Sequence, residues 1–217
     1  MALGFALAAV LALVDWVGVV RGDRRLRWIG KPGVMLALIA AALLTDDAPP
    51  AVRAWFVAAL VLSLIGDVAL LRPEHWFIVG LGAFLLAHMA YVGGMVQLDL
   101  HWAWGALVVV SAAALVGPVI LKAVRTGHPS LLGLVVIYLV VISAMAITAW
   151  CTHEAWLIAA AMLFFASDAM LCWGRFVTPI RMPRTGRAPA RPWGAALAVM
   201  VTYHGAQACF VAWLATR

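Results

Sequence analysis

Long runs of hydrophobic residues, separated by short clusters of charged residues and prolines, dominate the chain. A helix needs about 20 apolar residues to cross a hydrocarbon core of ~30 Å, and a chain in lipid must satisfy its backbone hydrogen bonds internally. Cutting the chain at its polar clusters predicts an all-α, polytopic membrane protein with eight transmembrane helices. They are expected at residues 2–21, 29–45, 52–71, 76–97, 102–122, 130–150, 154–173 and 193–215.

The composition supports a membrane class. Hydrophobic residues make up 66% of the 217 residues and charged residues 11%, which no soluble domain of this length can bury. We therefore expect a single integral membrane domain over residues 1–217. Its one long connection, about 174–192, is rich in Arg and Pro and is expected to be a cytoplasmic loop without a core. A topology determinant is the favoured role for this loop over contacts with lipid phosphates.

The basic residues predict the orientation. All of the fifteen Lys and Arg residues except Arg53 and Arg217 lie in or beside alternate connections, the first, third, fifth and seventh. The positive-inside rule places these connections in the cytoplasm and both termini outside, as for a plasma or bacterial inner membrane protein. Topology and anionic lipid account for the net charge of +6, so the charge does not call for nucleic acid as a partner.

Two features that would suggest a secreted protein are absent. The first segment carries Asp15 and Trp16 and has no Lys or Arg before it, which favours a retained helix over a cleaved signal peptide. The three cysteines, Cys151, Cys172 and Cys209, are scattered and lack metal-ligand spacing, so we expect them to be packing residues.

Two similar segments indicate an internal repeat. Aligning Asp67 on Asp168 places AALVLSLIGDVALL beside AAAMLFFASDAMLC, 101 residues apart. Because four spans separate the copies, the repeat predicts two parallel four-helix halves related by a pseudo-twofold axis along the membrane normal. Chance similarity of apolar composition is the alternative. If the repeat holds, the two aspartates lie at equivalent depth.

Asp67 and Asp168 are the residues that most need explanation. A carboxylate inside a span costs about 2.5 to 3.5 kcal/mol even on lenient scales, so each should face protein or water and have a partner. Both are four or five residues from the predicted cytoplasmic end of a helix. They either tie helices together through buried hydrogen bonds or form a functional site, and the residues alone leave both roles open.

Other polar side chains lie inside the predicted spans. Asp15 is expected to pair with Lys31 at the start of the second helix, although the Lys31-Pro32 step also suits an ammonium group that meets a lipid phosphate. His88 shares a helix face with Tyr91, and Tyr203 shares one with Gln207. Interhelical hydrogen bonding is the commoner role for such pairs.

Metal and hydrolase motifs do not stand out. The sequence contains no HExxH or GxSxG motif, which leaves a zincin or a serine hydrolase unsupported. His88 and His204 with the two aspartates leave a zinc site open without diagnostic spacing. His204 points about 100° away from Tyr203 on the same helix.

Taken together, the motifs resemble the YhhN family of eight-span membrane proteins, whose animal members are lysoplasmalogenases. The likeness covers nearly the whole chain. The matching elements are Lys31-Pro32, SLIGDVALL at 63–71, GLGAFLLAHMAYVGG at 80–94, Tyr138 with Met145, FFASDAMLCWGRF at 164–176 and YHGAQ at 203–207. The resemblance implies an ether hydrolase that cleaves the vinyl ether bond of lysoplasmalogens, giving a fatty aldehyde and a glycerophospho-base.

Vinyl ether hydrolysis suggests roles for the polar residues. The reaction needs a general acid to protonate carbon and an anion to stabilise the oxocarbenium ion, which two aspartates in one partly dry pocket supply. We expect Asp67 and Asp168 to be catalytic, without a metal or organic cofactor, and which of them is the acid stays open. The residues expected to bind the lysophospholipid substrate are Lys31, His88, Tyr91, Tyr203, Gln207 and Arg175.

Two other classes compete with the hydrolase. A proton-coupled transporter or lipid flippase also uses intramembrane carboxylates and repeats. Gly117-Pro118 is expected to interrupt the fifth helix, but the first helix has no matching break, which counts against a transporter. A partner subunit without chemistry of its own is the third possibility.

Overall fold

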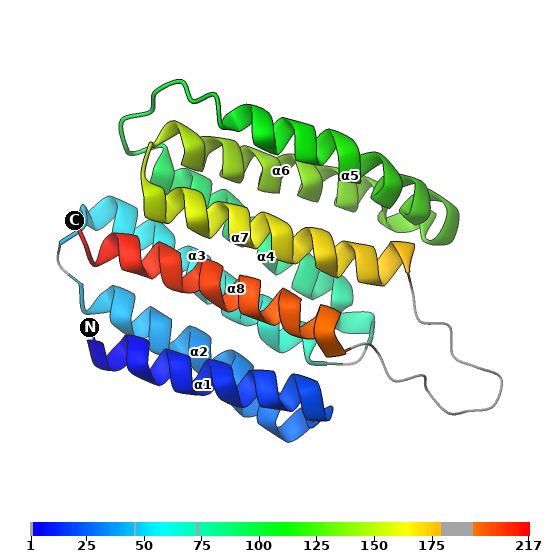
Figure 1. Ribbon diagram of the computed structural model, residues 1–217, viewed down its shortest axis with the longest axis horizontal. Helices are drawn as coiled ribbons and strands as arrows, with labels where there is room; N and C mark the ends of the chain where they lie inside the picture. Colours follow the sequence, from blue (N-terminus) through cyan, green and yellow to red (C-terminus); the bar gives the residue numbers. More distant parts are fainter. Residues whose placement is uncertain (1, 46, 73, 179–192) are drawn as a thin grey trace.

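The protein is an all-α integral membrane protein with several membrane spans. A computed structural model describes residues 2–45, 47–72, 74–178 and 193–217. Within these ranges eight helices are long and apolar enough to span a bilayer, and there is no strand, which confirms the predicted class (Figure 1). The spans are α1 (Ala2–Arg21), α2 (Arg24–Leu43), α3 (Pro50–Leu70), α4 (Phe77–Met95), α5 (Ala106–Gly127), α6 (Leu132–Cys151), α7 (Ala155–Cys172) and α8 (Trp193–Leu214).

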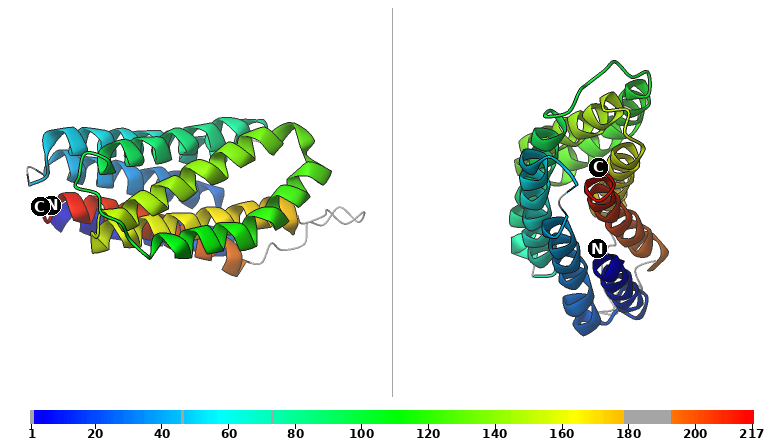
Figure 2. Two further views of the ribbon diagram at one scale, coloured as in Figure 1. Left: turned by 90° about the horizontal axis from the view of Figure 1, so that it is seen from above. Right: turned by 90° about the vertical axis from the view of Figure 1, so that its left-hand side faces the viewer.

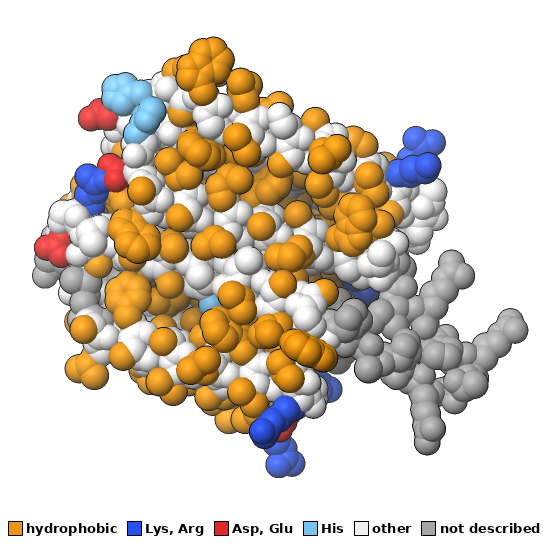
Figure 3. Space-filling model, in the orientation of Figure 1, with side chains coloured by type: hydrophobic (Ala, Val, Ile, Leu, Met, Phe, Trp, Pro, Cys, Tyr) orange, Lys and Arg blue, Asp and Glu red, His pale blue; other side chains and the backbone are white. Residues whose placement is uncertain are grey.

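Three short helical segments adjoin the spans. The 3-10 turns η1 (Glu74–Trp76) and η2 (Pro129–Leu131) precede α4 and α6, and a π-helical turn, η3 (Trp173–Val177), extends α7. Successive spans alternate in direction, so both chain termini lie at one end of the bundle (Figure 1). We call the opposite end, where α1, α3, α5 and α7 finish, the basic end. Hydrophobic side chains cover the middle of the face in Figure 3, and charged side chains gather toward its ends.

Six of the spans form a closed ring. Each of α2, α3, α4, α6, α7 and α8 packs on the next, and α8 returns to α2. α1 packs outside the ring on α2 and α8, and α5 packs outside it on α6 and η3; the end-on view in Figure 2 shows the arrangement. Exchanging the first four helices for the last four maps this ring onto itself. The ring therefore has the connectivity that the predicted repeat requires.

Small residues set how closely the helices approach. A Cβ atom on Gly30 would lie 2.5 Å from the backbone nitrogen of Asp15, so α2 touches the backbone of α1. A Cβ atom on Gly66 would lie 2.6 Å from the Phe84 ring, so a larger residue before Asp67 would force that ring on α4 to shift. Van der Waals packing of this kind drives helix association in lipid, where the hydrophobic effect between spans is lost.

The structure corrects the expected start of the second helix. It begins at Arg24 rather than at residue 29, because Asp23 caps it: the Asp23 carboxylate accepts hydrogen bonds from the backbone N–H groups of Arg25 (2.8 Å) and Leu26 (3.4 Å). Gly22 turns the chain just before the cap with a φ of 66°. Lys31 is therefore inside the helix and buried, not at its start.

The fifth helix also differs from expectation. It runs from Ala106 to Gly127, later than the expected 102–122, and it continues through Pro118 instead of breaking at Gly117-Pro118. The predicted loop at 174–192 begins inside η3, and its residues 179–192 lie outside the described residues.

Candidate functional site

Asp67 lies on the inner face of α3 within a fully buried cluster. The Tyr203 hydroxyl of α8 donates a hydrogen bond of 2.7 Å to its carboxylate, and the Lys31 ammonium of α2 lies 2.9 Å from the other carboxylate oxygen. None of these three residues is more than 3% exposed. The negative charge of Asp67 is thus balanced by a cation and satisfied by a hydroxyl, as a carboxylate in a membrane requires.

Asp168 lies on α7 in a second cluster of different chemistry. The Tyr138 hydroxyl of α6 donates a hydrogen bond to Asp168 Oδ2, and His88 Nε2 of α4 lies 3.6 Å from the same oxygen. Among the described residues no Lys or Arg forms an ion pair with this carboxyl group, and neither ring nitrogen of His88 has a hydrogen-bond partner. A buried imidazole without a partner needs an explanation, and a bound water or ligand is one.

The two clusters are built by exchange between the halves of the chain. Each aspartate receives one side chain from the helix before its own, Lys31 of α2 or Tyr138 of α6. Each receives a second from the last helix of the other half, Tyr203 of α8 or His88 of α4. The positions therefore follow the pseudo-twofold relation of the ring, while the residue types do not.

Aromatic rings separate the clusters. The Phe164 ring packs edge-on against His88, with ring centroids 4.6 Å apart, and against Tyr203, at 5.5 Å. No hydrogen bond or ion pair joins Asp67 to Asp168 in the described part of the chain. The Phe164 ring thus lies in contact with one residue of each cluster.

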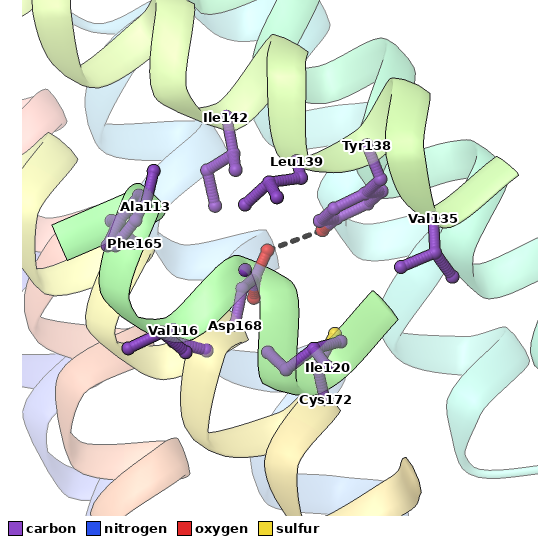
Figure 4. A pocket seen from close by; sticks show the side chains of 12 residues that line it. Ala113, Val116, Ile120, Val135, Tyr138, Leu139, Ile142, Phe165, Asp168 and Cys172 are labelled. Carbon is purple, nitrogen blue, oxygen red and sulfur yellow. Dashed lines mark hydrogen bonds between the residues drawn. The ribbon is translucent and has the colours of Figure 1, made fainter. Parts of the chain in front are cut away.

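Asp168 opens onto a cavity. A space of about 40 Å³ lies between α5, α6 and α7, and Figure 4 shows the Asp168 carboxyl group and the Tyr138 hydroxyl meeting at its wall. The remaining lining side chains are apolar apart from the thiol of Cys172. The Asp168 side chain is 10% exposed whereas that of Asp67 is fully buried. The volume has room for roughly one to three water molecules.

Two of the expected binding residues bond to each other. The Tyr91 hydroxyl of α4 donates to Gln207 Oε1 of α8 at 2.5 Å, and the Tyr91 ring stacks on Phe210 at 3.7 Å. This pair joins α4 to α8 inside the bundle. Arg175 is elsewhere: it binds Glu74 at the basic end and stacks over the Phe77 ring.

The expected Asp15–Lys31 ion pair is wrong. Asp15 is buried and pairs with Arg27 at 3.4 Å, one turn earlier on α2, because that helix starts before the expected boundary. Lys31 then points to Asp67 instead. His204 accepts a hydrogen bond of 3.1 Å from the Trp16 indole, and no group of three or more metal-binding side chains occurs in the described ranges.

Tyr138 is the site residue that residue-by-residue analysis missed. The sequence points to Tyr138 only through the family resemblance, because a tyrosine in a span usually forms interhelical hydrogen bonds. The available signal is its position, since it is the one aromatic hydroxyl in an otherwise strongly apolar helix, α6.

Comparison with known proteins identifies the family. Within the described residues, eight spans with the buried aspartates Asp15, Asp67 and Asp168 define a polytopic membrane protein with polar groups inside its helical bundle. The YhhN family model matches residues 26–214, and the chain belongs to the YhhN family.

Relatives carry two kinds of name. Proteins called "Lysoplasmalogenase" from Mycobacterium tuberculosis and Mycobacterium bovis are 38% identical over 133 residues, which cover 58% of this chain and 51% of each relative. An "Uncharacterized membrane protein YhhN" from Escherichia coli O157:H7 is 35% identical over 86 residues, 37% of this chain and 40% of the relative. The matched part thus spans about half the length of the mycobacterial relatives. No solved structure matches.

Proposed function

We propose that this protein hydrolyses the vinyl ether bond of lysoplasmalogens, releasing a fatty aldehyde and a glycerophospho-base. Membership of the YhhN family and the similarity to proteins named lysoplasmalogenase support this activity. One observation carries the proposal: the Asp168 carboxyl group, without a Lys or Arg partner among the described residues, faces an apolar cavity beside an imidazole that has no hydrogen-bond partner.

Asp168 is proposed as the general acid. An ionised carboxylate without a cation is costly in a membrane interior, so a carboxyl group in this position favours its neutral, proton-bearing form. Asp67 has Lys31 at 2.9 Å and is suited to stay an anion. The surroundings of the two carboxyl groups therefore divide their roles, as in other acid catalysts that use two carboxylates.

The proposed reaction uses Asp168 twice. Its proton is transferred to the alkene carbon one bond away from the ether-bearing carbon, which leaves an oxocarbenium ion beside the Asp168 carboxylate. Water in the cavity attacks the cation and returns a proton to Asp168, giving a hemiacetal. The hemiacetal then collapses to the aldehyde and the free glycerol hydroxyl. Tyr138 holds the Asp168 carboxyl group, and His88 accepts or donates a hydrogen bond to the water.

Asp67 is proposed as a positioning residue rather than as the second carboxylate of one shared pocket. It fixes Tyr203, whose ring packs on Phe164, and Phe164 packs on His88. Tyr91 and Gln207 hold α4 and α8 together in the same region. Lys31 is buried and committed to Asp67, so it is not proposed to bind the headgroup.

The depth of Asp168 suits this substrate. The vinyl ether bond is at the headgroup end of the alkenyl chain, and Asp168 is four residues before the end of α7, about 6 Å of helix rise. Arg175, seven residues further along, is proposed to meet the phosphate at the basic end. With the basic connections in the cytoplasm and both termini outside, the substrate enters from the inner leaflet.

The decisive experiment measures aldehyde release by purified protein. Lysoplasmalogen and a lysolipid with an ester bond at the same position are compared, with the Asp168→Asn variant as control. Aldehyde from the vinyl ether substrate alone, lost in Asp168→Asn, supports the proposal. Absence of aldehyde from folded parent protein, with proton-driven lipid or solute uptake in proteoliposomes, would replace it by the transporter alternative.

A further inference from the structure

A groove on the outer surface of α3 and α4 is separate from the aspartate sites. It has a volume of about 250 Å³, and all of its lining residues come from α3, α4 and the connection between them. Ile65 and Val79 on its wall are 48% and 46% exposed, so the groove faces the lipid. Ile65 is two positions before Asp67, about 200° around α3, which places the groove on the opposite side of the helix from the buried carboxylate.

The groove has a polar end and an apolar length. Arg72 lines it at the basic end, and the Arg72 guanidinium lies 4.7 Å from the centre of the Trp76 ring. Toward the membrane centre the lining is Leu64, Ile65, Val68 and Ala69 of α3, with Val79 of α4 opposite. From Leu64 to Arg72 the groove follows about 12 Å of helix, which is within the ~15 Å depth of one leaflet.

Positive charge at the polar end exceeds negative charge. Arg24 donates a hydrogen bond of 3.4 Å to the Leu71 carbonyl, so a second guanidinium lies at the backbone of the residue before Arg72, beside the groove lining. The nearby acid, Glu74, is bound by Arg175. Among the described residues the one charged or aromatic contact of Arg72 is the Trp76 ring. Two arginines and a tryptophan at the membrane interface are a setting that attracts anionic headgroups.

We propose that this groove binds an anionic glycerophospholipid of the adjoining leaflet, with one acyl chain along α3 and the phosphate held by Arg72 and Arg24. This lipid is a structural ligand from the surrounding bilayer. It is not the substrate of the Asp168 cavity, since the groove and the cavity lie on different helices. Trp76 marks the depth of the glycerol backbone. The positive charge at one end suits a phosphate group and the apolar lining suits an acyl chain. A phospholipid carries both groups, whereas a free phosphate ion has no acyl chain.

Native mass spectrometry of the detergent-purified protein tests the site. Dioleoyl phosphatidylglycerol, dioleoyl phosphatidylcholine and inorganic phosphate are added separately, and the bound fraction is titrated. We expect phosphatidylglycerol to be retained at least about fivefold more tightly than phosphatidylcholine, and Arg72→Gln to remove about that factor, as one arginine contributes at an anionic surface. Ile65→Trp, which fills the groove, should weaken phosphatidylglycerol binding without changing the charge.

Arg125→Gln is the matched control, because Arg125 is exposed at the basic end on α5, away from the groove. Its binding should equal that of the parent, and circular dichroism and gel filtration should show all variants folded and monodisperse. The proposal is overturned if both lipids are retained equally, or if phosphate alone binds as tightly as phosphatidylglycerol. It is also overturned if Arg72→Gln or Ile65→Trp leaves phosphatidylglycerol binding unchanged, or if Arg125→Gln lowers binding as much as Arg72→Gln. The readout does not depend on hydrolase activity.

Discussion

The two aspartate sites occupy equivalent places in the ring and differ in charge balance. Asp67 faces Lys31 and its side chain is fully buried, whereas Asp168 faces Tyr138 and His88 and opens onto the space between α5, α6 and α7. The same scaffold therefore holds one carboxylate in an ion pair with a lysine and leaves the other, among the described residues, without a direct Lys or Arg partner. In lipid the first arrangement stabilises the bundle, and we propose that the second is the reactive one, because a carboxyl group without an ion-pair partner favours its neutral, proton-bearing form.

The difference between the sites follows from two positions. Where α2 supplies a lysine, α6 supplies a tyrosine, and where α8 supplies a tyrosine, α4 supplies a histidine. The two halves of the ring thus differ in the partners of each carboxyl group rather than in the carboxyl groups themselves, and we propose that this difference divides their roles. Comparing matched substitutions in the two sites is the most direct way to test this division.

The largest expected contrast is in turnover. Asp168→Asn should lower vinyl ether hydrolysis by at least about 100-fold, because it removes the transferable proton and leaves a neutral side chain of the same shape. Asp67→Asn should retain turnover within about tenfold when rates are normalised to folded protein. Aldehyde release is measured for both at saturating substrate. If Asp67→Asn lowers turnover as much as Asp168→Asn, the comparison fails, since both carboxyl groups would then take part in the reaction.

Stability should show the opposite order. Asp67→Asn leaves the buried Lys31 ammonium without an anion and should lower the free energy of unfolding by about 3 to 5 kcal/mol. Asp168→Asn removes no ion pair with Lys or Arg and should cost about 1 kcal/mol. Unfolding in mixed micelles gives both values. Adding Lys31→Met to Asp67→Asn should recover most of the loss, and failure to do so would assign it to something other than the unpaired lysine.

A cavity-filling change should separate access from chemistry. Val116 lines the cavity on α5, and Val116→Phe should reduce turnover by about tenfold or more by displacing water or the substrate end, with a smaller effect on stability. Leu115→Phe is the matched control, because Leu115 is 78% exposed on the lipid side of the same helix. Equal rates for the two variants would mean that the cavity is not the reaction site.

The smallest contrast comes from the two tyrosines. Tyr203→Phe and Tyr138→Phe each remove one hydroxyl that donates to an aspartate. Each should cost about 1 to 3 kcal/mol of stability, as for other hydrogen bonds to carboxyl groups. Turnover should fall about tenfold for Tyr138→Phe only, measured as kcat with KM determined in parallel. A larger loss in Tyr203→Phe would place the reacting group at Asp67.

Periodicity and composition were enough to predict the eight spans. The start of α2 was misplaced because Arg24, Arg25 and Arg27 count against a span on hydropathy, while the Asp23 cap that begins the helix is a local hydrogen-bond signal. The same misplacement explains why the sequence favours a pair between Lys31 and Asp15 at the interface. Arg27, one turn earlier, takes Asp15 and leaves Lys31 for α3.

Buried aspartates were detectable from the sequence because charge in a span is conspicuous, but their partners were not. Tyr203 and Asp67 are 136 residues apart, and their contact depends on α8 closing the ring against α2 and α3. No local pattern encodes that closure. Nor does the sequence reveal that Asp168 meets a cavity, because the cavity is bounded by α5, α6 and α7 together.

The exchange of side chains between the halves also has a consequence for biosynthesis. When α3 leaves the ribosome and enters the membrane, Lys31 is already there to neutralise Asp67, while Tyr203 arrives only with the final span. Asp168 enters last of its group, after both His88 and Tyr138 are in place. Asp67 and Asp168 thus each enter a bilayer that already contains a partner, so the order of synthesis protects these two carboxyl groups from being left unsatisfied in the nascent bundle.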